Sequence, residues 1–204
     1  MTPPDAVVFV VDDDTLVRGA LEQLVKSVGL EAATFASAQE FLDAELPDIP
    51  SCLISDIRMP GLSGHDLQDE LKQRGNSVPI IFITGHGTVP MSVRAMKSGA
   101  VDFLEKPFED QELLDAIQHA IERNRSDRNI RVEIEGINKR IGSLTSREKE
   151  ILVLVISGKL NKEIAFELGM SENTVKSHRA RIMRKMTVGS IAELVRATEK
   201  AEFH

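Results

Sequence analysis

The stretch VVFVVDDD, residues 7–14, decides the fold of the first part of this chain. Five apolar residues run without interruption into three aspartates. A short, continuous apolar run of this kind is typical of a strand that a parallel sheet buries on both faces. The aspartates then follow the carboxyl end of the strand, and such ends form the edge where open α/β sheets bind their ligands.

Three further apolar runs also end close to a polar side chain. The pairs are Cys52–Ser55 with Asp56, Ile80–Ile83 with Thr84, and Phe103–Leu104 with Lys106. Helices are predicted between the runs, at about 15–28, 37–45, 64–73 and 89–97, and again from Asp110 onward. We therefore predict an α/β fold, in which a doubly wound sheet of five parallel strands alternates with five helices.

The polar side chains at these strand ends suit phosphoryl chemistry. Carboxylates are ligands that Mg²⁺ prefers, so Asp12 and Asp13 can hold such an ion beside Asp56. Asp56 can then act as the nucleophile that forms an acyl phosphate. Lys106 can neutralise charge on the transferred group, and Thr84 can donate its hydroxyl to a phosphate oxygen. Each residue alone is equally well explained as a cap or turn residue, and only their combination favours this chemistry.

Residues 5–122 resemble the receiver domain of two-component response regulators. The resemblance covers the whole of this segment and rests on short motifs at the four strand ends. These motifs are VDDD at 11–14, SDIRMPG at 55–61, ITGHG at 83–87 and FLEKPF at 103–108.

The resemblance implies a flavodoxin-like fold and a phosphoacceptor aspartate, which is Asp56 in this sequence. It implies that Thr84 and Lys106 assist phosphoryl transfer from a sensor histidine kinase. It also implies a bound Mg²⁺ or Mn²⁺ ion. The ligands of that ion would be Asp12, Asp13, Asp56 and the backbone carbonyl of Arg58.

Thr84 and Phe103 occupy the positions of the family's switch pair. Phosphate on Asp56 is expected to draw Thr84 toward it, and Phe103 then repacks into the vacated space. The segment Met91–Ala100 and the strand after it would present an altered face that dimerises. Phe103 lacks the hydroxyl of the tyrosine often found there. Only the change of the ring between a buried and an exposed position is therefore expected in this chain. His86 stands where family members differ in phosphate lifetime.

Charge divides the chain unequally. Residues 1–122 contain 8 Lys and Arg against 21 Asp and Glu, a net charge of −13, whereas residues 123–204 contain 17 against 11, a net charge of +6. An acidic half favours binding of a divalent cation, and a basic half is compatible with nucleic acid. The basic excess is modest, so charge supports this division without deciding it.

Residues 123–142 form a predicted helical linker between residues 1–122 and 143–204. Four isoleucines recur there at spacings of four, three and four residues: Ile130, Ile134, Ile137 and Ile141. The spacing predicts one apolar stripe along a helix, too short to establish a coiled coil and interrupted by Gly136. Two interpretations stay open, a linker helix packed on either domain and an extension of the preceding helix that pairs between subunits.

Residues 143–204 predict an all-α domain. Thr145–Glu148 reads as a capping box before one helix, Asn161 as the cap of the next, and Ser171 as the cap of a third. Gly169 supplies the turn between the last two, which is the helix-turn-helix pattern. The segment resembles the LuxR-type output domain of the FixJ and NarL branch of response regulators.

The helix predicted over 172–186 has two different faces. Val175, Ile182 and Met186 are expected to point inward, with His178 at the edge of the core. The opposite face is polar, basic and small, which fits a DNA major groove, although a merely solvated basic face is the alternative. The predicted DNA-contacting residues are Asn173, Thr174, Lys176, Ser177, Arg179, Ala180, Arg181, Arg184 and Lys185.

The resemblance also divides these contacts by role. Positions such as Lys176, Ser177 and Ala180 can approach base edges, with Lys176 as the main polar reader. The remaining basic residues are expected at phosphates, which position a protein without specifying a sequence. They are Arg179, Arg181, Arg184 and Lys185.

Together the two resemblances imply a DNA-binding transcription regulator that is controlled by phosphorylation and is not an enzyme. The expected partners are a sensor histidine kinase, double-stranded promoter DNA, RNA polymerase and, after phosphorylation, a second copy of the chain. The sequence has no signal segment and no apolar run near the roughly 18 residues of a membrane span, so we expect a cytoplasmic location and no membrane partner.

Two alternatives belong to other classes. One is a DNA-binding protein that works without phosphorylation and carries a relict receiver. The other is an aspartyl-phosphate phosphatase, which is disfavoured because Leu16 stands where the haloacid-dehalogenase pattern Asp-x-Asp-x-Thr/Val requires Thr or Val.

Overall fold

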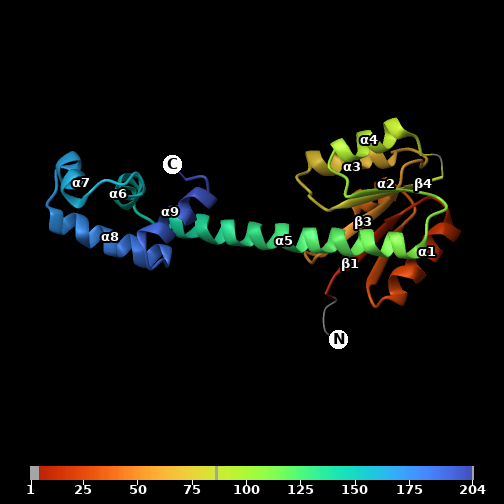
Figure 1. Ribbon diagram of the computed structural model, residues 1–204, viewed down its shortest axis with the longest axis horizontal. Coiled ribbons are helices and arrows are strands. Elements are labelled where there is room, and N and C mark those ends of the chain that lie inside the picture. The colour runs from red at the N-terminus through yellow and green to blue at the C-terminus, as the bar shows by residue number, and fades with distance from the viewer. Residues whose placement is uncertain (1–4, 86, 204) are drawn as a thin grey trace. The chain divides into compact units, whose positions relative to one another are not determined.

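The structure is a computed structural model that describes residues 5–85 and 87–203, so the prediction for His86 lies outside the described residues. The chain divides into two compact units, Met1–Arg128 and Asn129–His204, and each is described by itself. In the described residues the first unit contains the sheet and the second is helical (Figure 1).

The described part of the first unit is built on a five-stranded sheet in the order β2-β1-β3-β4-β5, with every pairing parallel. The predicted doubly wound sheet is thereby confirmed. Central strands are covered on both faces, which is why the runs in β1, β3 and β4 are continuously apolar. The strands are β1 (Val7–Val11), β2 (Glu31–Phe35), β3 (Ser51–Asp56), β4 (Ile80–Thr84) and β5 (Asp102–Glu105).

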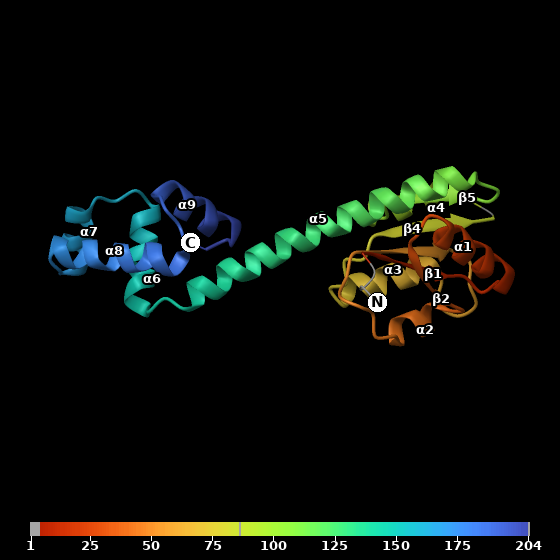
Figure 2. The ribbon, with the colours of Figure 1, turned by 90° about the horizontal axis from the view of Figure 1, so that it is seen from below.

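Helices cover both faces of this sheet, as Figures 1 and 2 show: α1 and α5 pack on one face, and α2, α3 and α4 on the other. Side-chain caps fix where three of them begin, since Asp14 caps α1, Ser37 caps α2 and Ser63 caps α3. The helices are α1 (Thr15–Ser27), α2 (Ala38–Asp43), α3 (Gly64–Gln73), α4 (Val89–Lys97) and α5 (Asp110–Gly142).

Alternation along β1 gives the unit two hydrophobic cores. Val8 and Val10 contact the core under α1 and α5, whereas Phe9 belongs to the core under α2, α3 and α4. Phe9, Phe35 and Phe41 pack edge to face or tilted, with ring centroids 5.2 to 6.2 Å apart. Cys52 is fully buried in β3 as predicted. Burial raises the pKa of its thiol to about 12, so the side chain stays protonated.

Helical spacing in the sequence also predicts an apolar stripe on α1, and part of this prediction was wrong. The predicted stripe is Leu16, Ala20, Leu21, Leu24 and Val28. Leu16 is 83% exposed and Val28 is 50% exposed, while Leu21 and Val25 are the buried residues of this helix. Helical spacing alone allowed several overlapping stripes. The angle at which α1 lies across the sheet selects the stripe that is covered.

The helix α5 runs without a break through residues 123–142, so the predicted linker is helical. Its first part belongs to the first unit. The side-chain oxygen of Asn124 accepts a 3.1 Å hydrogen bond from the backbone N–H of Ser51. Arg128 pairs with Asp48, with 2.6 Å between guanidinium nitrogen and carboxylate oxygen. Contacts between α5 and the rest of the first unit therefore extend beyond residue 122, where the receiver was predicted to end.

The isoleucine stripe of α5 is not covered along its whole length. Ile137 and Ile141 are buried in the core of the second unit, whereas Ile130 is 44% exposed and Ile134 is half-buried. Gly136 lies within the helix and is exposed. The C-terminal turns of α5 are therefore part of the second unit's core.

The second unit contains four further helices among its described residues, and this confirms the predicted all-α domain. Thr145 and Glu148 form the predicted capping box of the first, and Gly169 has a left-handed backbone (φ 62°) at the turn between the second and third. Glycine adopts that conformation without the Cβ strain of other residues. The helices are α6 (Ser146–Ile156), α7 (Asn161–Leu168), α8 (Glu172–Met186) and α9 (Ile191–Lys200).

The cap predicted for α7 was wrong. Leu160 is the N-cap residue, and its backbone N–H donates to the carboxylate of Glu163 at 2.7 Å. Asn161 is the first helical residue, and its side-chain oxygen accepts a hydrogen bond from Arg179 instead. The side chain of Asn161 therefore makes a tertiary contact, although asparagine is a residue type that caps helices well.

Among the residues that the structure describes, no helix combines the length and the apolar composition needed to cross a membrane.

Candidate functional site

The site predicted around Asp56 lies where the strand order of the sheet reverses. β1 pairs with β2 on one side and β3 on the other, with Val11 opposite Ser55. Asp12 and Asp56, the residues next along, therefore emerge side by side from adjacent strands. This is the switch point at which doubly wound sheets bind their ligands.

Lys106 joins these two carboxylates. Its Nζ lies 2.9 Å from Oδ2 of Asp12 and 3.0 Å from Oδ2 of Asp56. Its backbone N–H donates to the carbonyl of Thr84 at 2.8 Å, which places the lysine beside the end of β4. Four residues spread over positions 12 to 106 are thus brought to one edge of the sheet.

Asp12 is the most buried of these acids, and its side chain is 1% exposed. Burial raises the pKa of its carboxyl group, although the hydrogen bonds from Lys106 and from the backbone of Asp14 act against this. Burial by itself lowers the pKa of Lys106. Its hydrogen bonds to Asp12 and Asp56 outweigh that effect, so the pKa is raised and the lysine stays charged.

Asp56 keeps an accessible carboxylate. Its side chain is 14% exposed, and its Oδ1 accepts a 3.0 Å hydrogen bond from the backbone N–H of Arg58. One oxygen is thus oriented by the loop and the other by Lys106. A nucleophile is most effective when its geometry is fixed before the reaction.

The other two acids of the run differ from Asp12. Asp13 is exposed, whereas Asp14 accepts hydrogen bonds from the backbone N–H groups of Leu16 and Val17 and so caps α1. Sequence reasoning missed Arg18, whose Nη1 donates to the backbone carbonyl of Asp12 at 2.6 Å. Its position one helical turn after the acidic run was the available signal.

The residues at this edge fit a divalent cation. Asp12, Asp13 and Asp56 carry three negative charges, and Lys106 compensates only one of them. In the described residues no three acidic, histidine or cysteine side chains are gathered closely enough to form a complete metal cage. Mg²⁺ does not require one, because it commonly uses one or two carboxylates and completes its shell with water and phosphate oxygens. The carbonyl of Arg58 remains a predicted ligand.

The predicted switch residues lie close to this edge. Thr84 ends β4 and is fully buried, and Phe103 on β5 is half-buried opposite Phe82. A Cβ built on Gly87 would approach the Phe103 ring to 3.1 Å. Gly87 therefore lies against the edge of the aromatic ring, and a larger side chain at this position would restrict the movement of Phe103.

On α8 the predicted two-faced character is present. Val175, Ile182 and Met186 are buried, and His178 is half-buried at the edge of the core. The exposed face carries most of the residues predicted to contact DNA. These exposed residues are Asn173, Thr174, Lys176, Ser177, Ala180, Arg181 and Arg184.

Two hydroxyl groups on this face are already engaged within the helix. Ser177 Oγ donates to the backbone carbonyl of Asn173 at 3.0 Å, and the Thr174 hydroxyl lies 2.9 Å from that of Ser171. These contacts leave Lys176 as the exposed basic side chain on the first two turns of α8.

Two basic residues of α8 differ from the others. Arg179 donates to Asn161 at 2.6 Å, and Lys185 lies 2.6 Å from a carboxylate oxygen of Glu148. Both are half-buried and tied to other helices of the domain. The sequence pattern grouped them with Arg181 and Arg184, whereas the structure separates them from that group.

Two family models match this chain. The response regulator receiver domain matches residues 8–118, and the model of the bacterial regulatory proteins of the luxR family matches residues 142–198. The chain is a two-component response regulator. Both family resemblances predicted from the sequence are therefore confirmed.

Similar proteins cover the regulator along most of its length. Nodulation protein W of Bradyrhizobium diazoefficiens is 50% identical over 95% of this chain and 86% of its own. The transcriptional regulatory protein FixJ of the same organism is 43% identical over 95% of each chain. A solved structure of the response regulator StyR is 48% identical, covers 96% of this chain and 99% of its own, and has a TM-score of 0.86.

Membership of this family bears on the alternatives. Its members are transcription regulators and not enzymes, so the phosphatase alternative is excluded for the regulator. A receiver domain joined to a LuxR-type domain implies a sensor kinase as partner and DNA as target. Receiver domains generally bind Mg²⁺ at their acidic site, which agrees with the charge balance around Asp56.

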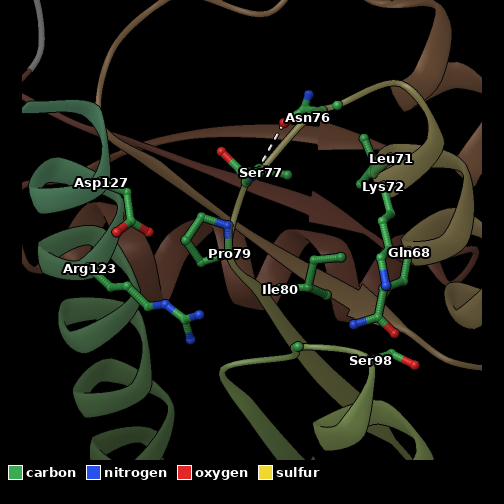
Figure 3. A pocket seen from close by; sticks show the side chains of 13 residues that line it. Gln68, Leu71, Lys72, Asn76, Ser77, Pro79, Ile80, Ser98, Arg123 and Asp127 are labelled. Atoms are coloured by element: carbon green, nitrogen blue, oxygen red, sulfur yellow. Dashed lines mark hydrogen bonds between the residues drawn. The ribbon is translucent and has the colours of Figure 1, made fainter. Parts of the chain in front are cut away.

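A hollow of about 340 Å³ lies at the amino-terminal edge of the sheet, opposite the edge that carries Asp56. Figure 3 shows Arg123 and Asp127 of α5 on one side of it and Gln68 and Lys72 of α3 on the other. α3 and α4 both end here, and their carboxyl ends carry partial negative charge that attracts cations. Asp127 is the one acid among the described residues that line this hollow, so the hollow offers no pair of carboxylates comparable with Asp12 and Asp56.

Proposed function

We propose that this regulator accepts a phosphoryl group on Asp56 from a sensor histidine kinase and thereby changes its binding to promoter DNA. One observation carries the proposal: the ammonium of Lys106 lies within 3.0 Å of both Asp12 and Asp56, while the Asp56 side chain stays partly exposed. A charged, oriented and accessible carboxylate beside a fixed cation is what in-line phosphoryl transfer requires.

Each side chain of the site has a separate role in this proposal. Asp56 Oδ attacks the phosphorus, and the bond between the phosphorus and the nitrogen of the kinase histidine breaks, so that the histidine leaves. Lys106 neutralises charge on the oxygens of the transferred group. Thr84 then donates its hydroxyl to one of them. Asp12, Asp13, Asp56 and the Arg58 carbonyl would hold Mg²⁺ or Mn²⁺, which supplies further charge neutralisation when bound.

Phosphorylation is proposed to act through Thr84 and Phe103. When Thr84 moves toward the phosphate, the half-buried ring of Phe103 gains room to repack. The neighbouring helix α4 offers a dimerisation face, because Val93 is 44% exposed and Met96 is 47% exposed. Isolated apolar residues are common on surfaces, but this pair lies on the helix that contacts β5, the strand of Phe103, and so links phosphorylation to association.

The dimer would bring two output domains onto paired half-sites of promoter DNA. We propose that residues 1–122 act as the receiver, 123–142 as a helical linker and 143–204 as the DNA-binding domain. Lys176 is proposed to read base edges, while Arg181 and Arg184 contact phosphates. A two-fold dimer requires half-sites roughly 10 base pairs apart, and RNA polymerase is the proposed further partner at the promoter.

Labelling by a small phosphodonor tests this proposal. Acetyl phosphate with Mg²⁺ is expected to label the wild-type chain and not Asp56→Asn. Undiminished labelling of that variant would defeat the assignment of Asp56. No labelling of the wild type would favour the phosphorylation-independent alternative.

Sedimentation of the same proteins tests the dimer. Beryllofluoride, which mimics the acyl phosphate, is expected to raise the mass of the wild type toward that of a dimer at micromolar concentration and to leave Asp56→Asn unchanged. A mass that beryllofluoride does not alter would refute the link between the phosphate and association.

A further inference from the structure

Lys185, on the last turn of α8, is engaged by two groups inside the output domain. Its Nζ lies 2.6 Å from Oε2 of Glu148 and donates to the backbone carbonyl of Ser143 at 3.1 Å. Glu148 Oε2 also accepts a 2.9 Å hydrogen bond from the backbone N–H of Thr145. One ammonium and one carboxylate thus join the residue that follows α5, the start of α6 and the end of α8.

The carboxylate of Glu148 depends on this contact. Its side chain is only 4% exposed, and a buried carboxylate is strongly destabilising when its cationic partner is removed. The hydrogen bond from Lys185 is the largest cause that holds the pKa of Glu148 below its usual value, followed by that from Thr145. If Lys185 turned toward a DNA phosphate, it would leave this charge without its partner.

The apolar contacts around the ion pair join the same elements. Ile137 and Ile141 of α5 lie in one hydrophobic core with Ile182 and Met186 of α8. Near the middle of α8, Arg179 donates a hydrogen bond to Asn161, the first residue of α7. Two polar contacts therefore join α8 to other helices of the domain, and Lys185 provides the one beside the start of α6.

We propose that Lys185 is a positioning residue that does not contact the DNA phosphates. It holds α8, the proposed recognition helix, against the start of α6 through Glu148 and against the residue after α5 through the carbonyl of Ser143. This inference rests on the proposed DNA-binding role of α8 and refines it. Contact with base edges requires α8 to lie at a defined depth and angle in the groove. The contacts of Lys185 set that position from inside the output domain, beside the residue that follows α5.

Glu148→Gln separates the two roles of Lys185. The substitution keeps the size of the side chain and frees Lys185 to reach a phosphate. A phosphate contact predicts binding that is unchanged or tighter, whereas a positioning role predicts weaker binding. The probe is a DNA duplex that the wild-type regulator selects from a random pool, compared with a random duplex over a salt series.

We expect Glu148→Gln and Lys185→Met to weaken binding to the selected duplex by a similar factor of roughly ten, the scale of a single base contact. The ratio of selected to random binding should fall, and the double variant should bind no more weakly than either single variant. The salt dependence should keep its wild-type slope. Lys200→Met is the matched control, since it breaks an exposed ion pair with Glu133 of α5 in which no residue of α8 takes part, and it should leave binding unchanged.

Three results would overturn the inference. One is unchanged or tighter binding of Glu148→Gln together with a flatter salt slope in Lys185→Met, which would establish a phosphate contact. Another is an equal loss of affinity for selected and random duplexes, in proportion to the loss of folded protein. That result would mean that the Lys185–Glu148 pair only stabilises the fold. The third is hydrogen exchange at residues 184–186 that is as slow in DNA-free Glu148→Gln as in the wild type. We expect exchange in this variant to be faster.

The exchange measurement needs no DNA and is independent of the proposed function. If the wild type selected no duplex at all, the DNA-binding proposal would fail while faster exchange in the last turn of α8 still supported the role of Lys185 in holding α8. If the wild type selects a duplex and the exchange is unchanged, that role fails and the DNA-binding proposal stands.

Discussion

The acidic edge of the receiver and the exposed face of α8 reach function in different ways. Asp12, Asp56 and Lys106 are separated by about half the chain and meet only because three strands end at one edge. The exposed residues of α8 lie within one helix of 15 residues. The first site is assembled by the sheet, whereas the second is displayed by a single element.

This difference teaches how the two regions should respond to substitution. In the receiver one ammonium serves two carboxylates, so a change in any member alters the charge and geometry of the others, and effects should not add. On α8 the side chains of Lys176 and Arg184 are exposed and separated, so each should change one property of binding alone. Three predictions test this contrast, and a fourth concerns a buried histidine of the receiver.

Asp13→Asn should have the largest effect. Loss of an outer-shell partner lowers metal affinity about 10- to 100-fold, and loss of a ligand should cost at least as much, so labelling by acetyl phosphate should fall about 100-fold at limiting Mg²⁺. Excess Mg²⁺ should restore part of it. Labelling rates measured against Mg²⁺ concentration test the prediction.

Asp14→Asn is the matched control for that change. It removes the same charge from the neighbouring residue, but Asp14 caps α1 and asparagine is an equally good cap. Labelling should therefore stay near the wild-type rate. Equal losses in the two variants would mean that net charge, and not ligation by Asp13, supports the reaction.

Lys176→Ala should have the next largest effect, confined to one base pair. Removing a side chain that reads a base near the amino end of the recognition helix costs about 1–3 kcal/mol of binding free energy at the cognate pair and relaxes discrimination there. Binding to duplexes matched and mismatched at each position measures it. A uniform loss at every position would show that α8 enters the groove differently.

Arg184→Ala should weaken binding to all sequences alike. Removal of one phosphate contact flattens the plot of log affinity against log salt by roughly one unit. Arg196→Ala is the control, because it removes the same charge from the surface of α9, where the side chain is exposed. If both variants changed the slope equally, the basic surface would act as a whole and the contrast with the receiver would weaken.

His65 should produce the smallest effect, and a pH-dependent one. Its ring is buried against Phe82 with centroids 5.2 Å apart, and in the described residues neither ring nitrogen has a hydrogen-bond partner. Burial lowers its pKa below the ordinary 6.5, and Arg94 adds to this while Asp69 and Asp66 oppose it. The unfolded chain therefore binds a proton more readily, so the free energy of unfolding should rise with pH below about 6.5 and level off above it.

His65→Leu should remove that slope, since leucine fills the site without titrating. Each unit of pKa depression is worth about 1.4 kcal/mol, which sets the scale of the change. His119→Leu is the control, because His119 is exposed on α5 and should leave the slope in place. Urea denaturation at a series of pH values measures both. An unaltered slope in His65→Leu would assign the titration to another group.

Much of the receiver could be predicted because buried strands carry a continuous apolar signal. β1, β3 and β4 lie inside the sheet, and their runs marked them correctly. β2 is an edge strand whose five residues are exposed or half-buried, so no apolar run marked its place. The partners of Asp12 and Asp56 followed from the rule that parallel strands end at one edge, but the burial of Asp12 beside an exposed Asp13 did not.

The sequence by itself determined the order of the elements, the polar residues at the strand ends and the two faces of α8, because these depend on local periodicity. Only the tertiary structure decided what covers each face. Arg179 and Lys185 have the same local pattern as Arg181 and Arg184, yet Asn161 and Glu148 engage the first pair from other helices. Helical spacing specifies which side chains share a face, whereas partners such as these are brought there only when distant segments pack together.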